Sequence, residues 1–436
     1  MQLGHRLGRA IAWNILAAGS TAGANLVAAV ILANILGRDV FGELGIVQST
    51  IMSVGGIAQL ATGLAATKYV AEYRLERKES AGEVLGLCAA ATALTGAFGA
   101  IVLYLSAKVV ATSVLGAPEL VESMGLASGV VLFLTMNGFQ AGALAGLENY
   151  RSIAIISASH AVLHVSICAA SGWMGGLRGV LIGLIVSSAV RWVLFNAALR
   201  KEARRQGIEI SMKRLGSEAK VVATFATPAA LAGMSALLAT WAGNAILVRQ
   251  ESGIGQMGLY AAANSLRGIV LFLPALVNNV GVSVINNFYG SRHLGGYRAA
   301  FWGNFWVTCV SLLMGAPILL LFGEPVLRAF GRDFIEAVPL LRVVFFSALL
   351  EGLSVAAYQI VLSRARIWTA LYVISLPRDC LIVGLAWLLV PKSGALGLAL
   401  SQAMSYAVAL LLTLWLASNI GFGTETLDNT KIRGNA

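Results

Sequence analysis

Six charged side chains lie within long apolar stretches of the sequence, where a charge is unusual. The bases are Arg191, Arg267, Arg342 and Arg378, and the acids are Glu351 and Asp379. A charge at the centre of a bilayer costs about 2.5–3.5 kcal/mol on insertion scales, so such a residue normally faces protein or water. Arginine keeps its charge there, and its planar guanidinium binds phosphate oxygens in pairs. These residues are therefore candidates to bind an anionic group, such as a diphosphate or an acidic sugar.

Three of the six residues lie near the middle of their apolar stretches. At about 1.5 Å of rise per helical residue, Arg378 and Glu351 lie roughly 17 Å from the inner end, and Arg267 lies about 14 Å from the outer end. A structural ion pair is the alternative, in which Glu351 neutralises either Arg378 or Arg267. Asp379 directly follows Arg378, so the two side chains do not share one helical face.

Two more features extend the candidate site. Asn264, Arg267, Pro274 and Asn278 follow steps of three, seven and four residues, which place them on one face of a helix that we expect to line water. Arg191 lies about 12 Å from the inner face of its stretch. It is placed either to meet a lipid phosphate at an entrance or to extend its side chain to the inner surface.

A pair of histidines lies apart from these charges. His160 and His164 are four residues apart and so lie on one face of a helix. We expect packing, or contact with a proton or a sugar. We predict neither a metal site nor a cofactor site in the chain.

The amino-acid composition indicates that these residues belong to a membrane protein and not to a soluble one. Of 436 residues, 58% are hydrophobic and only 12% are charged, whereas soluble domains carry about 25% charged residues. This excludes a soluble enzyme, and the apolar content excludes disorder. The net charge of +11 does not indicate nucleic-acid binding, because the basic residues fall in loops between apolar segments.

The apolar segments predict an all-α polytopic membrane protein of about twelve transmembrane helices, because a helix needs about 20 apolar residues to cross a bilayer. We place Val109 to Leu115 in an outer interfacial turn. The twelve predicted spans are 10–36, 43–66, 83–106, 120–147, 152–173, 177–199, 221–247, 258–287, 299–322, 337–362, 367–390 and 394–418.

The loops predict the orientation and the division into domains. Lys and Arg are concentrated in the loops on the side of the N-terminus, which predicts that both termini are cytoplasmic. The basic loop 200–220 separates a first lobe, 1–199, from a second lobe, 221–418, and the residues 419–436 form a cytoplasmic tail. We expect this basic loop to contact anionic membrane lipids.

The two predicted lobes are weakly similar to one another. At an offset of 216 residues, the segment from Phe41 to Ser49 aligns with the segment from Met257 to Ser265, and Gly42 aligns with Gly258. Because each half has six spans, an even number, both halves begin on the same side of the membrane. The repeat is therefore parallel. Transporters built from such repeats hold their substrate between the halves, near the midplane.

Three segments carry a resemblance to a known family. Ile35-Leu36-Gly37-Arg38-Asp39-Val40-Phe41-Gly42 is similar to the turn after the first span of bacterial polysaccharide flippases, and Lys68-Tyr69-Val70-Ala71-Glu72-Tyr73 resembles their first inner loop. The stretch from Phe330 to Leu341, FGRDFIEAVPLL, resembles their motif before span ten. The chain is thereby identified as similar to the oligosaccharide branch of the multidrug/oligosaccharidyl-lipid/polysaccharide exporter superfamily.

The resemblance implies an architecture and a function. Two six-helix lobes would enclose a central cavity in the bacterial cytoplasmic membrane. A polyprenyl-diphosphate-linked oligosaccharide would pass through it by alternating access, from the inner to the outer leaflet, for cell-surface polysaccharide synthesis. The chain has no nucleotide-binding loop, so a proton or sodium gradient, or removal of the product outside, would give direction. A polysaccharide polymerase complex is the protein partner that the resemblance suggests.

Two other functions compete with the flippase. A cation-coupled drug exporter of the same superfamily would use intramembrane acids, but the bases among the six charged residues outnumber the acids. A membrane glycosyltransferase or polymerase would commonly need a large outer loop, and the predicted outer loops are short. The sequence thus favours a transporter that is not an enzyme.

Overall fold

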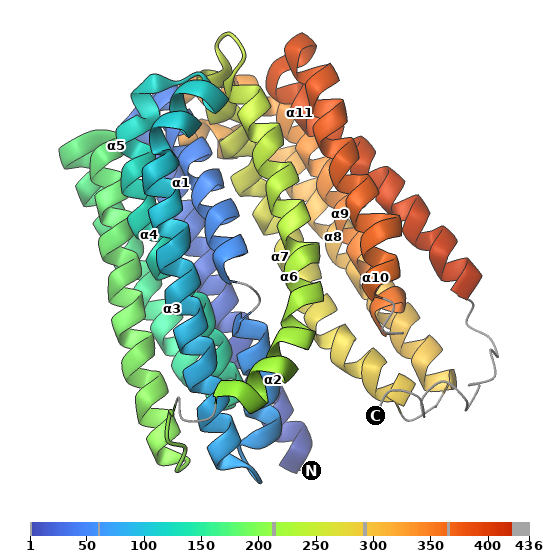
Figure 1. Ribbon diagram of the computed structural model, residues 1–436. Helices are drawn as coiled ribbons and strands as arrows, with labels where there is room; N and C mark the ends of the chain where they lie inside the picture. Colours follow the sequence, from blue (N-terminus) through green and yellow to red (C-terminus); the bar gives the residue numbers. More distant parts are fainter. Residues whose placement is uncertain (1, 60–61, 212–214, 291–293, 364–366, 421–436) are drawn as a thin grey trace.

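The computed structural model describes residues 2–59, 62–211, 215–290, 294–363 and 367–420, and these residues are almost entirely helical (Figure 1). The predicted linker 200–220 thus lies partly, and the tail beyond residue 420 wholly, outside the described residues. The helices are α1 (Gln2–Gln59), α2 (Thr62–Tyr73), α3 (Lys78–Val109), α4 (Val121–Gly146), α5 (Tyr150–Arg205), α6 (Leu215–Val248), α7 (Gly253–Gly290), α8 (Leu294–Phe330), α9 (Val338–Ser363), α10 (Ile367–Ala370) and α11 (Leu376–Ile420).

Three of these helices are broken by glycine and cross the apolar layer twice. α1 has 58 residues and is interrupted at Gly37, α5 has 56 residues and is interrupted at Gly175 and Gly176, and α11 has 45 residues and is interrupted at Gly394. Gly37, Gly176 and Gly394 have positive φ, between 54° and 75°, which glycine adopts without the penalty that a side chain would bring. Three double crossings and the single crossings of α3, α4, α6, α7, α8 and α9 account for the twelve predicted spans.

One predicted boundary is wrong. The expected outer turn from Val109 to Leu115 is helical, because α3 continues into a π-helix over Val110–Leu115 that ends at Gly116 with φ 68°. The predicted second span, 43–66, covers the end of α1 and the start of α2, and residues 60 and 61 within it lie outside the described residues. The Thr62 hydroxyl donates to the carbonyl oxygen of Gln59 at 2.8 Å and lies 2.7 Å from the Thr92 hydroxyl.

The helices form two bundles (Figure 1). α1 to α5 pack mainly with one another, and α7, α8, α9 and α11 pack in the second bundle together with α6, while α1 also contacts α6 and α7 across the boundary. Close packing depends on small residues: a Cβ on Gly142 of α4 would stand 2.2 Å from the carbonyl oxygen of Gly63 in α2. Gly138, Gly142 and Gly146 of α4 form consecutive GxxxG steps, and a Cβ on any of them would stand less than 3 Å from a neighbouring atom. They therefore form a packing face, as in membrane helices generally.

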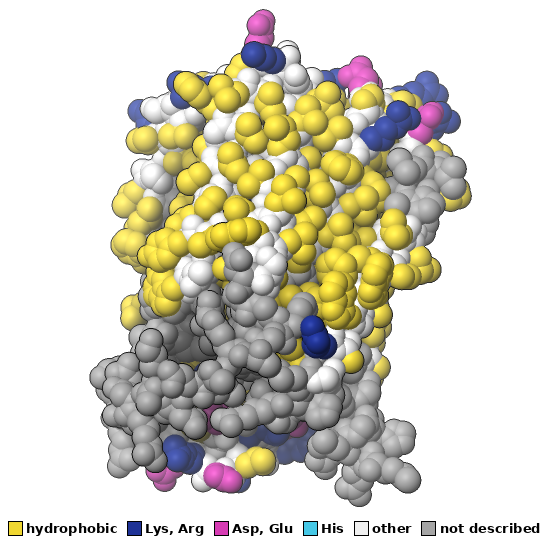
Figure 2. Space-filling model, turned by 90° about the vertical axis from the view of Figure 1, so that its right-hand side faces the viewer, with side chains coloured by type: hydrophobic (Ala, Val, Ile, Leu, Met, Phe, Trp, Pro, Cys, Tyr) yellow, Lys and Arg dark blue, Asp and Glu magenta, His cyan; other side chains and the backbone are white. Residues whose placement is uncertain are grey.

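The surface of the second bundle is that of a membrane protein. Figure 2 shows hydrophobic side chains across the middle of this face, with the charged side chains gathered toward its two ends. Large apolar residues such as Leu313 and Met314 are more than half exposed there. Lipid tails, rather than water, are the medium in which such a surface is stable.

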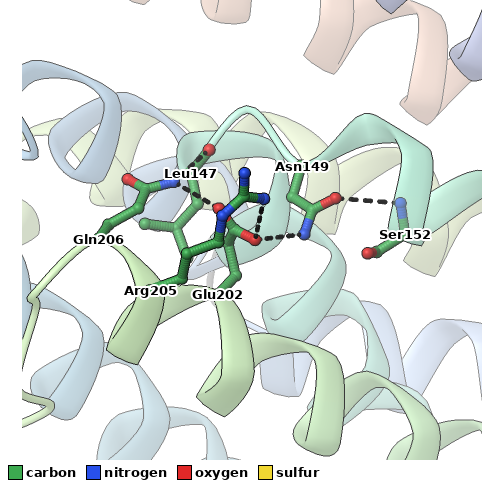
Figure 3. Close-up of polar contacts among 6 residues, drawn as sticks. All are labelled: Leu147, Asn149, Ser152, Glu202, Arg205 and Gln206. Atoms are coloured by element: carbon green, nitrogen blue, oxygen red, sulfur yellow. Dashed lines mark hydrogen bonds and ion pairs between the residues drawn. The ribbon is translucent and has the colours of Figure 1, made fainter.

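A buried polar cluster fixes the base of the α5 hairpin, where the start and the end of α5 come together (Figure 3). The Glu202 carboxylate accepts hydrogen bonds of 2.9 Å from Asn149 Nδ2 and from Gln206 Nε2, and Gln206 Nε2 also donates to the carbonyl oxygen of Leu147 at 3.0 Å. Asn149 Oδ1 caps the helix by accepting from the Ser152 amide. With the glycine turn at the other end, this cluster holds the two halves of α5 side by side.

The two bundles meet at the end of the molecule away from the N-terminus (Figure 1). A Cβ on Gly42 of α1 would stand 1.9 Å from the carbonyl oxygen of Ile254, and a Cβ on Gly258 of α7 would stand 2.2 Å from that of Arg38. At the offset of 216 that aligns the two lobes, Gly42 corresponds to Gly258 and Arg38 corresponds to Ile254. The two contacts are therefore equivalent, and a pseudo-two-fold axis relates them.

A polar bridge reinforces this glycine contact. Arg38 Nε donates to the carbonyl oxygen of Gly255 at 3.2 Å, and Arg38 Nη1 lies 2.8 Å from Glu336 Oε2. Asn34 Nδ2 donates to the carbonyl oxygen of Ala329 at 2.6 Å. α1 is thus bound at this end both to α7 and to the region that joins α8 to α9.

A larger residue at Gly42 should open this contact. In Gly42→Leu the added atoms meet backbone that cannot turn aside, at a cost of about 1–3 kcal/mol, or roughly five- to a hundredfold in the closed population. A cysteine pair at Gly45 and Ala261, where a Cβ on Gly45 would lie 3.1 Å from the Cβ of Ala261, reports closure by its rate of disulfide cross-linking.

Gly23→Leu is the matched control on the same helix, since a Cβ at Gly23 meets nothing within 4 Å. We expect slower cross-linking with Gly42→Leu and an unchanged rate with Gly23→Leu, in a background without the native cysteines. Equal rates in both variants would show that the glycine contact does not hold the bundles together.

Candidate functional site

Four of the predicted charges of the second lobe form two ion pairs. Arg267 forms an ion pair with Glu351, and the Tyr406 hydroxyl donates to the same carboxylate at 3.2 Å. The guanidinium carbons of Arg267 and Arg378 each lie 5.7 Å from the centroid of the Tyr406 ring, within the range of cation–π attraction. Glu351 therefore pairs with Arg267, one of the two partners that the sequence left open.

Arg378 is neutralised by its neighbour in sequence. Its Nε and Nη2 atoms lie 2.8 Å and 2.6 Å from Asp379 Oδ1. The Asp379 side chain is buried. The π-helix over Leu371–Ser375 directly precedes this pair, and such segments often occur at functional sites. Arg267, Arg378, Glu351 and Asp379 together carry no net charge.

The polar face predicted on α7 is divided between two environments. Asn264 is exposed to a cavity and accepts a hydrogen bond of 3.3 Å from Arg267 Nη1. Asn278 is buried, donates to the carbonyl oxygen of Pro274 at 2.9 Å and accepts from Asn304 Nδ2 at 2.9 Å. Asn278 thus satisfies the interior of the second lobe, whereas Asn264 is available to a ligand.

A cavity of about 590 Å³ lies between the two lobes. It is lined by α1, α4 and α5 on one side and by α6 and α7 on the other. None of the lining residues that the structure describes is acidic. The polar or basic side chains around it include Asn25, Gln48, Ser49, Asn137, His160, His164, Ser188, Arg191, Thr240, Asn244, Tyr260 and Asn264.

Arg191 supplies the positive charge of this cavity. Its guanidinium carbon lies 5.2 Å from the centroid of the Phe195 ring, and its buried Nε has no hydrogen-bond partner. Within the described part of the chain no carboxylate lies within ion-pair distance of Arg191, in contrast to Arg267 and Arg378. Arg191 lines the inter-lobe cavity.

The histidine pair shares the same wall of the cavity. His160 Nε2 lies 2.9 Å from Ser187 Oγ, and His164 Nδ1 lies 3.0 Å from the same oxygen. The sequence predicted that the two rings share a face but did not indicate Ser187, which lies in the other half of the α5 hairpin. No group of three or more His, Cys, Asp or Glu side chains in the described residues is arranged to hold a metal ion.

Breaking the ion pair of the second lobe should destabilise the protein. Glu351→Gln leaves Arg267 buried without its partner, at a cost of about 3–5 kcal/mol. Arg267→Met combined with Glu351→Leu removes both charges and should recover most of this loss. The midpoint of thermal unfolding of the purified protein measures the effect of each change.

The exposed pair of Arg328 and Glu324, at 2.8 Å, provides the matched control. Glu324→Gln should cost less than about 1 kcal/mol, because water screens an exposed pair. If Glu351→Gln lowered the midpoint no more than Glu324→Gln does, the Arg267–Glu351 pair would not be a structural support.

The family model described as polysaccharide biosynthesis protein matches residues 7–280, which is more than half of the chain. Among the curated proteins compared with it, none matches.

Solved structures share the fold over nearly the whole chain. An inward-facing multidrug resistance MATE family transporter of the MOP superfamily superposes with a TM-score of 0.80 at 16% identity, covering 92% of this chain and 94% of its own. A MOP superfamily transporter from Pyrococcus furiosus, described as having a binding pocket of reverse polarity, gives a TM-score of 0.71 at 15% identity and 95% coverage of both chains.

A third similar structure is the MATE multidrug transporter DinF-BH in complex with R6G, with a TM-score of 0.70, 18% identity and 95% coverage of both chains. At these identities the likeness concerns the fold. Together with the family match, it confirms the resemblance noted in the sequence: the chain belongs to the polysaccharide biosynthesis protein family and has the fold of the MOP-superfamily transporters.

Proposed function

We propose that the protein is a flippase for a polyprenyl-diphosphate-linked oligosaccharide, which it moves from the inner to the outer leaflet of the cytoplasmic membrane. The observation that carries the proposal is the unpaired charge of Arg191 in a cavity between two lobes. In a low-dielectric site such a charge favours an anion strongly, and its planar fork suits phosphate oxygens. The diphosphate of the carrier lipid would supply the missing negative charge.

The dimensions of the cavity agree with a lipid headgroup. Its volume of about 590 Å³ lies within the range of about 300–1,000 Å³ that is common for small-molecule sites. Asn25, Gln48, Asn244 and Asn264 line the cavity and are suited to hydrogen-bond sugar hydroxyls. The diphosphate and the adjoining sugars would bind here, while the polyprenyl chain stays in the lipid.

The closed end of the molecule supports alternating access. If both termini are cytoplasmic, as the basic loops predict, the Gly42–Gly258 contact closes the outer side of the cavity. The substrate would then enter from the inner leaflet and leave when this contact opens. An ion gradient, or consumption of the glycan by a polymerase complex outside, would give direction to the cycle.

The drug-exporter alternative has less support from the site. A cationic drug would need an acidic partner, but no acid is found among the described residues that line the cavity. The acids near it, Glu351 and Asp379, are already paired with arginine. The reverse polarity described for the binding pocket of the Pyrococcus furiosus transporter indicates that pocket polarity varies among proteins of this fold, so the fold alone does not favour a cationic substrate.

Removal of the Arg191 charge should slow transport strongly. In proteoliposomes that contain a lipid-linked oligosaccharide, we expect Arg191→Gln to slow the exposure of the glycan to an impermeant glycosidase by about ten- to a hundredfold. This corresponds to the loss of one charge-assisted hydrogen-bonded contact, roughly 1.5–3 kcal/mol. Arg191→Lys keeps the charge but not the planar guanidinium, so its transfer rate should lie between those of the wild type and Arg191→Gln.

Arg342→Gln is the matched control, because Arg342 is an intramembrane arginine whose side chain is exposed on α9. It should leave the transfer rate unchanged at equal amounts of folded protein. Normal transfer by Arg191→Gln would contradict the proposed site. Absence of transfer by the wild type, together with efflux of a cationic dye, would favour the exporter.

A further inference from the structure

The hydrogen bonds around Ser187 define the protonation of the histidine pair. His160 Nε2 lies 2.9 Å from Ser187 Oγ and 3.2 Å from the carbonyl oxygen of Ser187. A carbonyl oxygen only accepts hydrogen bonds, so both contacts are hydrogen bonds in the tautomer that carries a hydrogen on His160 Nε2. In that tautomer the Ser187 hydroxyl receives a hydrogen bond from His160 and has its own hydrogen left to donate.

That remaining hydrogen is directed to the second imidazole. Ser187 Oγ lies 3.0 Å from His164 Nδ1, and the hydroxyl has one hydrogen to donate. His164 Nδ1 is then an unprotonated acceptor, and its ring is neutral. In this tautomer the hydrogen bonds run from His160 through Ser187 to His164, and the basic nitrogen at the end of the chain takes a proton when the hydroxyl turns.

The arginine of the cavity lies one helical turn from this chain. Ser187 and Arg191 are four residues apart in the second half of α5, so they share one face and lie about 6 Å apart along the axis. His160, His164 and Arg191 all line the inter-lobe cavity. A proton on the pair and the guanidinium would be two like charges in a medium of low dielectric, which is unfavourable until an anion is present.

We propose that the His160–Ser187–His164 chain is a proton site coupled to the anion site at Arg191, so that the anionic group and a proton bind together. The inference rests on the proposed function, because the anion is taken to be the diphosphate of the carrier lipid. An anion between Arg191 and the histidine pair would neutralise the guanidinium and favour a protonated imidazole. By linkage, the proton then strengthens binding of the anion by the same factor.

Few other groups compete for this role. Among the described residues that line the cavity, the charged or titratable side chains are His160, His164, Arg191 and Tyr260. The facing elements α1 and α4 contribute uncharged polar groups, such as Asn25 and Asn137. The Cys168 sulfur lies 3.8 Å from His164 Nδ1. The proton balance is simple: one proton is taken from the aqueous side with the anion and is carried with it.

The test is the number of protons taken up when a prenyl diphosphate binds. Isothermal titration calorimetry of the purified wild type with farnesyl diphosphate, in two buffers of different ionisation enthalpy, gives this number. We expect the wild type to take up about one proton more than His160→Gln/His164→Gln. For each unit fall in pH, the affinity of the wild type for farnesyl diphosphate should rise by up to about tenfold more than that of the double variant. The proton exchange of the probe itself is common to both proteins.

Single variants keep the test decisive if the double variant does not fold. His164→Gln removes the nitrogen at the end of the chain and should lose most of the extra uptake, with binding retained at pH 8. His5→Gln, which removes a histidine far from α5 in sequence, should behave as the wild type. Equal proton uptake in the wild type and His164→Gln would overturn the coupling.

The experiment separates the coupling from the function on which it rests. Binding that depends on Arg191 but shows no histidine-dependent proton uptake overturns the proton site alone. Failure of the wild type to bind farnesyl diphosphate, or equal binding by Arg191→Gln, overturns the proposed anion site and the coupling with it. Binding that requires Arg191 and takes up the extra proton supports both.

Discussion

The structure depends on how its arginine side chains within the helix bundle, away from water, are neutralised. An ion buried in a medium of low dielectric must be paired or must have a ligand to pair with. The second lobe pairs its ions internally, Arg267 with Glu351 and Arg378 with Asp379, around the ring of Tyr406. The first lobe leaves Arg191 without a carboxylate among the described residues. Under the proposed function, these two pairs support the second lobe, and the first lobe offers its unpaired charge to an anion.

The backbone places this unpaired charge where a substrate could reach it. The glycine turn and the Glu202 cluster hold the halves of α5 together, so that the histidines of one half face Ser187 and Arg191 of the other. The contact of Gly42 with Gly258 closes one end of the space between the lobes. Because equivalent positions of the two lobes meet there, a small relative rotation would separate both parts of the contact together.

Much of the fold could be predicted from the sequence, because apolar length and glycine are local signals. The breaks at Gly37, Gly176 and Gly394 coincide with predicted ends of spans. The site was less accessible to prediction. Helical spacing placed Arg267 and Glu351 at similar depths, but the rotation of each helix, which decides whether they pair or face the cavity, depends on packing with other helices. Ser187 gave no signal, since its role depends on a partner in a different span.

The most direct test is a cryo-electron microscopy structure of the protein in a lipid nanodisc with farnesyl diphosphate bound. The account predicts density for the diphosphate in the inter-lobe cavity, within hydrogen-bond distance of the Arg191 guanidinium, while the Arg267–Glu351 and Arg378–Asp379 pairs stay intact. Density for the diphosphate at Arg267 or Arg378, with those pairs broken and Arg191 unoccupied, would contradict it.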